Sequence, residues 1–377
     1  MTACAFIGLG VMGFPMAGHL RAAGNPTTVY NRTASKADAW VDAHGGSSAP
    51  TPREAAAGAE AVMVCVGNDD DLRSVVFGDD GALAGMAEGS TLVDHTTASA
   101  EVAREIAAAA ADIDVGFVDA PVSGGQAGAE NGQLSIMCGG EPDVFTTVEP
   151  LMQAYARAIV LVGDVGSGQL TKMVNQICIG GLIQGLAEAL DFSRRAGLDT
   201  DKVLSAISQG ASGSWQMENR ARTMLDRHFD HGFAVDWMRK DFGIVFGEAE
   251  RIGATLPVTA MVDQFYARLQ REGHGRWDTS SLMELLRDDY TGSPRQPVRF
   301  RPLGLSARLR LELHRHLRHL NSIPGLVDPL WEAMGLPHRS AGLRSGGIKR
   351  ATESWRGRHG WQRQGWAEQQ NSRLQDR

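Results

Sequence analysis

Three glycines near the N-terminus constrain the fold of this chain more than any other feature. They are Gly8, Gly10 and Gly13 in AFIGLGVMGFPMAGHL, directly after an apolar run and at the start of a helical pattern. In such a turn the first glycine permits the bend, the second lets a pyrophosphate approach the backbone, and the third lets helix and strand pack closely. The motif in this context predicts a dinucleotide-binding turn. The turn residues expected at the cofactor are Gly8, Leu9, Gly10, Val11, Met12 and Gly13.

The alternation of apolar runs and alanine-rich helical patterns predicts two domains. The expected strands are Cys4–Gly8, Thr28–Asn31, Ala61–Val66, Thr91–Asp94, Val115–Asp119, Leu134–Cys138 and Ile159–Val162. This rhythm indicates a parallel sheet covered by helices. After Gly168 only helices are expected, at Leu170–Ala196 and at 199–210, 235–252, 257–271 and 279–287. We therefore predict an α/β Rossmann domain over residues 1–165, followed by an all-α domain over 166–290.

Residues 291–377 differ in composition from the rest of the chain. They carry 16 Lys and Arg against 6 Asp and Glu, a balance of +10, whereas residues 1–290 have a balance of −17. This basic tail could be a nucleic-acid-binding arm, a helix that packs on a partner, or out-of-frame coding sequence. The abrupt boundary and the excess of arginine favour the third explanation. The tail is therefore expected to be disordered and dispensable, without a nucleic-acid partner.

Cysteine usage and hydropathy indicate a cytoplasmic protein. Cys4, Cys65, Cys138 and Cys178 lack metal-binding spacing, so they predict buried thiols in a reducing compartment and no metal site. The N-terminus lacks the basic segment of a signal peptide. The longest uncharged apolar stretch, Met173 to Ala187, is too short to span a membrane, contains three amides, and predicts a helix buried on most sides.

The end of the second expected strand bears on the choice of cofactor. An NAD site usually places Asp or Glu there, but this chain has Asn31, Arg32 and Thr33. An arginine can pair with the 2′-phosphate of NADP. The sequence therefore favours NADP(H), with NAD(H) as the alternative if Arg32 is only a solvated surface residue.

Five motifs together resemble the β-hydroxyacid dehydrogenases, a family that includes 3-hydroxyisobutyrate dehydrogenases and 2-hydroxy-3-oxopropionate reductases. The motifs are FIGLGVMGFPMA, DHTTAS, DAPVSGGQAGAENGQLSIMCGG, GSGQLTKMVNQ and FAVDWMRKDFG, and the resemblance covers about residues 1–290. It implies a Rossmann domain, a helical domain and an active site between them. It also implies a small hydroxyacid or semialdehyde substrate, and a homodimer or homotetramer in which the long helix pairs two subunits.

The resemblance also implies residue roles. It places substrate carboxylate recognition on Ser123, Gly124 and Gly125, and it makes Lys172 the catalytic residue, with Asn175 and Gln176 facing the substrate. Cofactor contacts are implied at Val66, Thr97, Phe233, Lys240 and Asp241. The segment VGND, residues 66–69, replaces the usual proline-bearing loop, which puts the local cofactor contacts in question.

The chemistry of the residues agrees with a role for Lys172 in proton transfer. Residues 1–290 hold four lysines, and Lys172 opens an uncharged run. Hydride addition to a carbonyl leaves an alkoxide that needs a proton donor, and a desolvated ammonium can supply the proton. Lys172, Asn175 and Gln176 are spaced i, i+3 and i+4, so they share one helix face. The alternative is a lysine that extends from a helix end to solvent.

Other interpretations of the motifs remain open. The same scaffold could carry an imine reductase, which usually lacks the lysine, or a relative of 6-phosphogluconate dehydrogenase. A remote alternative is a binding module that anchors a nucleic-acid-binding tail. His95 is expected to make local hydrogen bonds, and Asp69–Asp71 to begin a helix. Trp215 and Met217 could line the substrate pocket or pack in the core.

Overall fold

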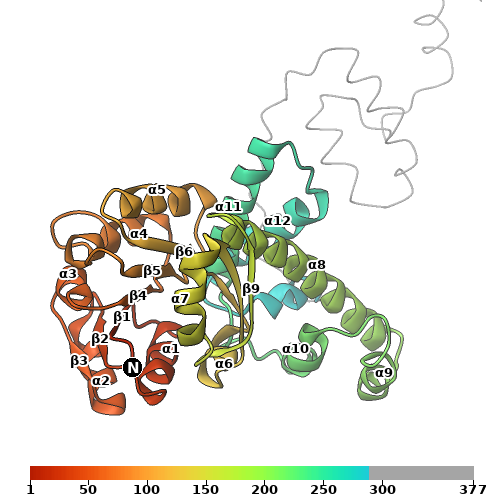
Figure 1. The fold of residues 1–377 in the computed structure, drawn as a ribbon. Coiled ribbons are helices and arrows are strands. Elements are labelled where there is room, and N and C mark those ends of the chain that lie inside the picture. Colours follow the sequence, from red (N-terminus) through yellow and green to blue (C-terminus); the bar gives the residue numbers. More distant parts are fainter. Residues whose placement is uncertain (288–377) are drawn as a thin grey trace, which may run out of the picture. The chain divides into compact units, whose positions relative to one another are not determined.

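The computed structural model describes residues 1–287 of the chain. The expectations for the basic tail 291–377, and for the last residues of the predicted all-α domain, lie outside the described residues. Within the described part, an α/β domain is followed by a helical domain, and both belong to one compact unit (Figure 1). The predicted fold class, a Rossmann domain followed by a helical domain, is confirmed.

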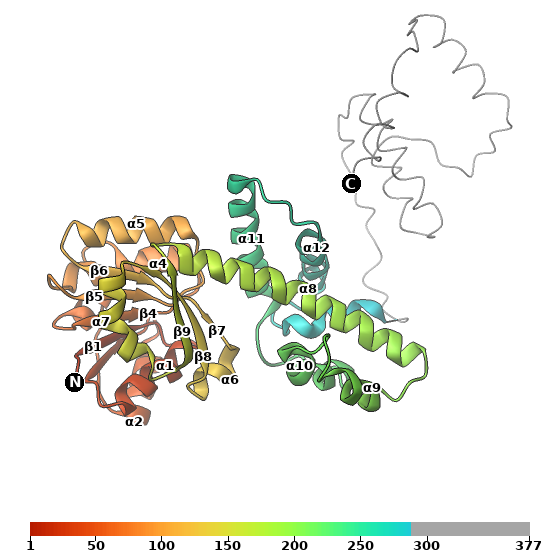
Figure 2. The same cartoon turned by 45° about the vertical axis from the view of Figure 1, so that its right-hand side comes forward.

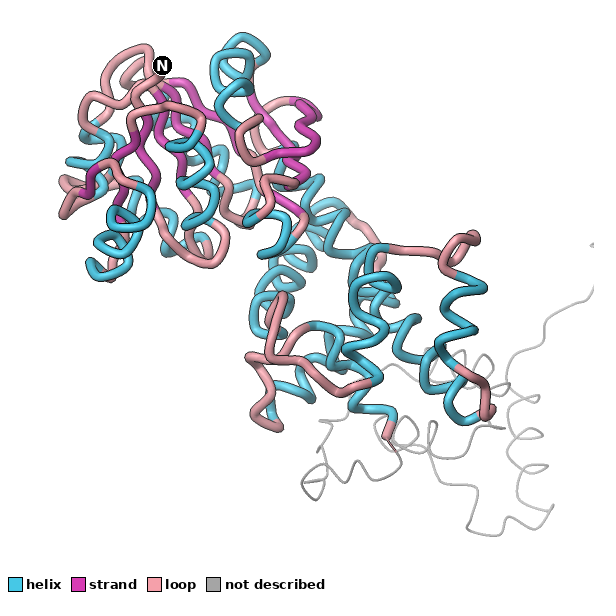
Figure 3. Tube along the Cα trace, turned by 90° about the horizontal axis from the view of Figure 1, so that it is seen from below, coloured by secondary structure: helices cyan, strands magenta, loops and turns pink. Residues whose placement is uncertain are grey.

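One sheet forms the centre of the α/β domain (Figure 3). Its path is β3-β2-β1-β4-β5-β6-β8-β7, and β9 pairs with β8. From β3 to β6 all pairings are parallel, in the order expected for dinucleotide-binding folds. The strands are β1 Cys4–Ile7, β2 Thr27–Tyr30, β3 Ser47–Ser48, β4 Ala61–Val64, β5 Thr91–Asp94, β6 Gly116–Asp119, β7 Val122–Ser123, β8 Leu134–Gly140 and β9 Ala156–Gly163.

The expectation of a wholly parallel sheet is wrong at one edge. β8 is antiparallel to both β6 and β7, whereas β9 is parallel to β8. After β6 the chain continues through the short strand β7, turns through α6 (Gly125–Glu130), and runs back as β8. This return places Ser123 of β7 beside Ser135 of β8, at the point where α6 begins.

Helices cover both faces of the sheet because its central strands are apolar on both sides. Along β1, Cys4 and Phe6 belong to the core cluster on one face, and Ala5 and Ile7 to the cluster on the other. The helices of this domain are α1 Gly13–Ala22, α2 Ala34–His44, α3 Pro52–Ala56, α4 Asp69–Val76, α5 Ala100–Ala111, α7 Pro142–Met152 and the short 3₁₀ helix η1 Ala82–Gly85.

The long helix α8 (Ser167–Arg195) connects the two domains and crosses the helical domain (Figure 2). It contacts β8 near the sheet and five helical elements beyond it. These are α9 Thr200–Ile207, α10 Trp215–Leu225, α11 Val235–Ile252, α12 Pro257–Arg271 and the 3₁₀ helix η2 Thr279–Leu286. The last predicted helix is therefore a 3₁₀ helix, and α10 was not predicted. Pro257 begins α12, and Gly253 ends α11 in a left-handed conformation.

The expectation that α8 is buried on most sides is wrong for a single chain. Val174 and Phe192 are 60% and 71% exposed, and Leu182 is also exposed. By length and composition α8 could cross a membrane, but its other side packs in the core of the helical domain. The expectation that all four cysteines are buried is wrong for Cys178, which is exposed on α8, whereas Cys4 and Cys138 are buried. The apolar run has two sides, and the residues that the structure describes cover only one of them.

Candidate active site

The glycine-rich turn has the conformation that its three glycines predict. Gly8 has φ +97°, and a Cβ there would lie 2.2 Å from the carbonyl oxygen of Cys65. A Cβ on Gly13 would lie 2.0 Å from the carbonyl oxygen of Gly8, so the start of α1 packs directly on the turn. A Cβ on Gly10 would meet nothing within 4 Å, so the backbone stays accessible on that side. These features fit a turn that receives a pyrophosphate against its backbone.

The end of β2 supports this turn. Asn31 accepts a hydrogen bond through Oδ1 from the backbone N–H of Leu9 (2.9 Å), and its Nδ2 donates to the carbonyl oxygen of Thr33 (3.0 Å). The Leu9 side chain is buried, whereas Val11 is exposed at the beginning of the helix turn. The side chain of Arg32 is 84% exposed and pairs with Asp71 at 3.2 Å. Arg32 therefore has a carboxylate neighbour that a 2′-phosphate would have to replace.

Two loops after β4 and β5 lie beside this turn. The backbone N–H of Val66 donates to Oγ1 of Thr96 (3.1 Å), which joins the two loops. Asn68 caps α4 by accepting from the N–H of Asp71, so the acidic run begins a helix as predicted. Lys240 of α11 donates to the carbonyl oxygens of Gly67 (3.2 Å) and Thr97 (2.5 Å). The helical domain thus holds both loops at the carboxyl ends of the strands.

The substrate loop expected at residues 123–125 lies at the start of α6. Gly124 has φ +130° and Gly125 has φ +62°, conformations that favour glycine. A Cβ on Gly125 would meet nothing within 4 Å, so the backbone here is open to an approaching group. The hydroxyl of Ser123 donates to Oδ1 of Asn175 on α8 (3.3 Å). This contact brings the loop together with the helix that carries Lys172.

Asp119, at the end of β6, anchors the beginning of α8. Its Oδ1 accepts from the N–H of Gly166 (2.7 Å) and its Oδ2 from the N–H of Gln169 (2.8 Å). A Cβ on Gly168 would lie 2.4 Å from the carbonyl oxygen of Met137, so the helix start packs tightly on β8. Burial raises the pKa of Asp119 to about 6, and the backbone hydrogen bonds from the helix start oppose that rise. Asp119 was not identified from the sequence.

Gln169 links α8 to the loop after β5. Its Nε2 donates to the carbonyl oxygen of Thr96 (2.7 Å), and its Oε1 accepts from the N–H of Ala98 (3.0 Å). Gln169 is fully buried and lies three residues before Lys172. The helical spacing that marked Lys172 and Asn175 would also have marked Gln169, but its partners were not predictable from spacing.

Lys172 is buried, with 7% of its surface exposed. Burial lowers its pKa from 10.5 to about 8, because the charged ammonium loses hydration. Asp241 opposes this shift, and the nearby Lys240 adds to it. The alternative of a lysine extending to solvent is therefore excluded. An amine with a pKa near neutrality can both donate and accept a proton.

The polar face of α8 continues into α11. Asn175 Nδ2 donates to Oε1 of Gln176 (2.8 Å), and Gln176 Nε2 donates to Oδ2 of Asp241 (2.5 Å). Asp241 is buried, and its Oδ1 pairs with Lys240 at 2.9 Å. Hydrogen bonds and ion pairs therefore join Ser123, Asn175, Gln176, Asp241, Lys240 and Thr97. Arg32 and Phe233 do not belong to this network.

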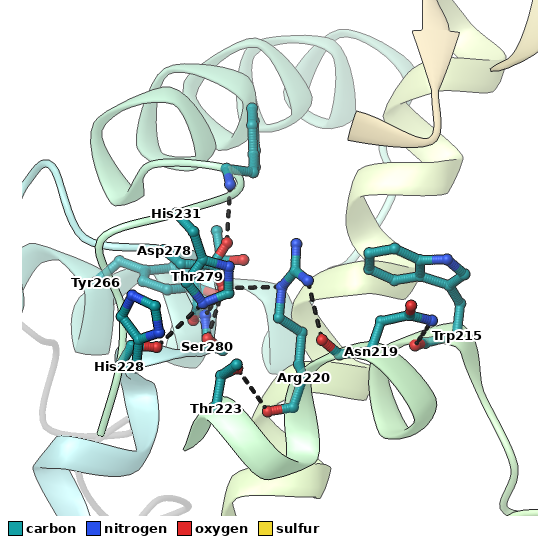
Figure 4. Close-up of polar contacts among 11 residues, drawn as sticks. Trp215, Asn219, Arg220, Thr223, His228, His231, Tyr266, Asp278, Thr279 and Ser280 are labelled. Atoms are coloured by element: carbon teal, nitrogen blue, oxygen red, sulfur yellow. Dashed lines mark hydrogen bonds and ion pairs between the residues drawn. The ribbon is translucent and has the colours of Figure 1, made fainter. Parts of the chain in front are cut away.

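Phe233 lies in the segment before α11, which is held by a separate cluster around Asp278; Figure 4 shows Asp278 with Arg220 and Ser280. Its backbone N–H donates to Oδ2 of Asp278 (2.8 Å), a buried carboxylate that also accepts from the backbone N–H of Ser280. Arg220 pairs with Asp278 at 3.2 Å and lies 4.8 Å from the ring of Trp215. This cluster ties η2 and α10 to the Phe233 segment. Asp278 was not identified from the sequence.

The remaining sequence candidates have structural roles. His95 is buried between the carbonyl oxygen of Ala120 (2.7 Å) and the hydroxyl of Tyr155 (2.9 Å). Burial lowers the pKa of His95 to about 4, so the ring is neutral near pH 7. This confirms the expected local hydrogen bonding. Met217 packs in the core of the helical domain, and Trp215 is exposed.

Comparisons with known proteins agree with this geometry. The family model described as the NAD binding domain of 6-phosphogluconate dehydrogenase matches residues 3–163. The model described as NAD-binding of NADP-dependent 3-hydroxyisobutyrate dehydrogenase matches residues 166–286. An uncharacterized oxidoreductase of Shewanella frigidimarina is 60% identical over 286 residues, which cover 76% of this chain and 98% of that protein.

Two further matches are named for their activity. The 3-hydroxyisobutyrate dehydrogenase of Pseudomonas aeruginosa is 33% identical, over 76% of this chain and 99% of its own. The solved structure of Mycobacterium tuberculosis 3-hydroxyisobutyrate dehydrogenase with L-serine has a TM-score of 0.70 at 28% identity, and covers 76% of this chain and 99% of that one. The fold and the dinucleotide turn define an NAD(P)-dependent oxidoreductase. The chain belongs to the β-hydroxyacid dehydrogenase family.

Proposed function

We propose that the protein interconverts a small β-hydroxyacid and its semialdehyde, with Lys172 as the general acid and base. The observation that carries this proposal is the position of Lys172, which is buried on the same helix face as Asn175 and Gln176 and has a pKa of about 8. Its presence also favours this reaction over imine reduction.

A bound nicotinamide cofactor would supply or accept the hydride, and the residues of the chain would bind the substrate and transfer the proton. In the reductive direction the Lys172 ammonium donates a proton to the developing alkoxide oxygen, and in the oxidative direction its neutral amine accepts the hydroxyl proton. The open backbone at Gly124 and Gly125 lets a substrate carboxylate approach N–H groups. Burial of the Lys172 side chain limits competition from water.

We propose that the protein binds NADP(H) in preference to NAD(H). The residues that would hold it are those of the turn at 8–13, the end of β2 at 31–33, and the loops at Val66 and Thr97. Lys240 connects both loops to α11. Arg32 supports NADP(H) because it is the cation at the end of β2 and is accessible to a phosphate.

We also propose that two chains pair through α8. The support is its exposed apolar side chains, Val174, Leu182 and Phe192, on a helix whose opposite side is already buried. Size measurement in solution would test this. A monomer at micromolar concentration would contradict the pairing.

A substrate panel combined with one variant tests the reaction. The panel is 3-hydroxyisobutyrate, D-glycerate, L-serine, 3-hydroxypropionate and 4-hydroxybutyrate, each with NADP and with NAD. Lys172→Ala should lower kcat on the best substrate by at least about 10²-fold, the loss typical of a missing general acid. It should still bind NADPH, as measured by fluorescence titration. Near-normal kcat in Lys172→Ala would refute the role of Lys172.

A further inference from the structure

Arg32, the residue proposed to hold the 2′-phosphate of NADP, is already paired with a carboxylate. Its Nη1 donates to Oδ1 of Asp71 at 3.2 Å, and the two residues are 39 positions apart in the sequence. Arg32 follows β2, and Asp71 lies in the first turn of α4, so the pair connects the segment after β2 to the helix after β4. A phosphate that binds Arg32 therefore meets a carboxylate that is already in place.

Asp71 is the fixed member of this pair. Its backbone N–H donates to Oδ1 of Asn68 (2.8 Å), and its carbonyl oxygen accepts from the hydroxyl of Ser74 (2.7 Å). Its side chain is 31% exposed, whereas that of Arg32 is 84% exposed. A Cβ on Gly67 would lie 2.6 Å from Oδ2 of Asp71, so the carboxylate packs directly on the loop after β4. Arg32 can turn towards an arriving ligand, whereas the carboxylate of Asp71 stays where it is.

The helical domain fixes the loop against which Asp71 packs. Lys240 of α11 donates to the carbonyl oxygen of Gly67 (3.2 Å). The ring of Trp237, also on α11, would lie 3.5 Å from a Cβ on Gly67. Neither contact involves Arg32. The position of Asp71 is therefore set by packing that remains when its ion pair with Arg32 opens.

The surroundings of Arg32 combine features that attract a phosphate with one that opposes it. The first N–H groups of a helix attract anions, and α2 begins directly after Thr33. The side chain of Thr33 makes no capping hydrogen bond to this helix. Among the three carboxylates in the first turn of α4, Asp71 is the one that pairs with Arg32. The same side chain that would bind the phosphate is thus held by a competing anion.

We propose that Asp71 is a specificity-determining residue that competes with the 2′-phosphate for Arg32 and so limits the preference for NADP over NAD. NADP has to open the ion pair and leaves the carboxylate close to the phosphate, where like charges repel each other. NAD carries a 2′-hydroxyl instead and leaves the pair intact. The inference rests on the proposed NADP site and adds the residue that sets how strongly this site selects the phosphate.

Asp71→Asn tests the competition, because the amide has the shape of the carboxylate but no charge. The dissociation constants of NADP and NAD are measured by calorimetry on the full chain, at one low ionic strength since salt screens exposed charges. The variant should bind NADP about fivefold more tightly, the upper range for an exposed ion pair, and NAD within about twofold of the wild type. An unchanged ratio of the two constants would overturn the proposal.

Asp70→Asn is the matched control, since Asp70 lies in the same helical turn and its replacement changes the net charge equally. The side chain of Asp70 is 98% exposed and pairs with Arg73 at 3.9 Å instead of with Arg32. The control should leave the ratio of the two dissociation constants unchanged. An equal gain in NADP affinity in Asp70→Asn would assign the effect to the total charge of α4 and would also overturn the role of Asp71.

A double-mutant cycle shows whether Asp71 acts through Arg32. In Arg32→Gln the guanidinium that Asp71 holds is absent. Adding Asp71→Asn to this variant should change the dissociation constant of NADP by less than about twofold, because no ion pair is left to open. A gain as large as in the wild-type background would mean that Asp71 acts on the phosphate directly, which contradicts competition for Arg32.

The outcomes separate this inference from the proposed function. A chain that binds both dinucleotides but oxidises no member of the substrate panel refutes the proposed reaction, and the change in ratio in Asp71→Asn still decides the role of Asp71. A wild type that binds NAD more tightly than NADP refutes the cofactor preference. A gain for NADP in Asp71→Asn would then still support the competition, and no gain would overturn it. A wild type that binds neither dinucleotide refutes both.

Discussion

Replacing Lys172 by methionine should stabilise the protein at neutral pH. Methionine has a similar length and no charge, so Lys172→Met removes the cost of burying an ammonium. Burial lowers the pKa of Lys172 from 10.5 to about 8. At 1.36 kcal/mol per pH unit, this difference corresponds to about 3 kcal/mol. Lys172 would therefore be a residue whose role in the reaction opposes stability.

The stabilisation by Lys172→Met should depend on pH. The pKa of Lys172 is lower in the folded state, so between about pH 8 and pH 10.5 the unfolded chain binds a proton that the folded chain does not. Wild-type stability should therefore rise with pH across this window relative to the variant. The advantage of Lys172→Met should be largest below about pH 8 and should be nearly gone above about pH 10.5.

Urea unfolding at a fixed protein concentration measures this difference, because any oligomer adds a concentration term. Wild type, Lys172→Met and the control Lys36→Met, which loses an exposed ammonium on α2, would be compared between about pH 7 and pH 10. The control should stay within about 0.5 kcal/mol of the wild type. A difference between wild type and Lys172→Met that does not change with pH would show that the ammonium carries no desolvation cost.

The remaining predictions concern activity, cofactor choice and packing. Oxidative kcat/KM should rise with pH to a plateau with an apparent pKa of about 8, as neutral Lys172 becomes available, and a profile that is flat from about pH 6 to 9 would contradict this. Arg32→Asp should shift preference from NADP towards NAD, and a wild type that already prefers NAD would disprove the role of Arg32. Gly168→Ala should lower the free energy of unfolding by about 2 kcal/mol or more, whereas the control Gly247→Ala, whose Cβ meets nothing within 4 Å, should raise it by about 0.5–1 kcal/mol. A chain truncated after Tyr290 should keep kcat, and loss of folding on truncation would show that the tail belongs to the structure.

The fold could be predicted from the sequence because its signals are local. The strand before Gly8, the glycine spacing and the helix start together specify one supersecondary unit. Pro257 and Gly253 mark helix ends through their own backbone preferences. The antiparallel β8 could not be predicted, because its direction depends on the return through α6, and the glycines of this return do not specify the direction of the strand that follows.

The exposed side of α8 was missed for a related reason. An apolar run indicates that its side chains avoid water, but it does not identify the surface that covers them. Val174 and Phe192 satisfy the same pattern as the buried residues of the helix, yet they are exposed within one chain. Hydropathy therefore predicted the helix correctly and its environment incorrectly.

The part of the candidate site that lies on one face of α8 could be predicted from the sequence. Gln169, Lys172 and Gln176 follow one another at helical spacing, and all three are buried. Gln169 binds the loop after β5, and Gln176 binds Asp241 of α11. Lys172 lies between these two glutamines along α8. The sequence gives the periodicity, but the partners come from segments more than 60 residues away. Asp119 fixes the start of α8 at the sheet, and a small rotation of this helix would displace all three side chains together. The position of Lys172 relative to the cofactor loops therefore depends on the anchoring of the helix as much as on the lysine itself.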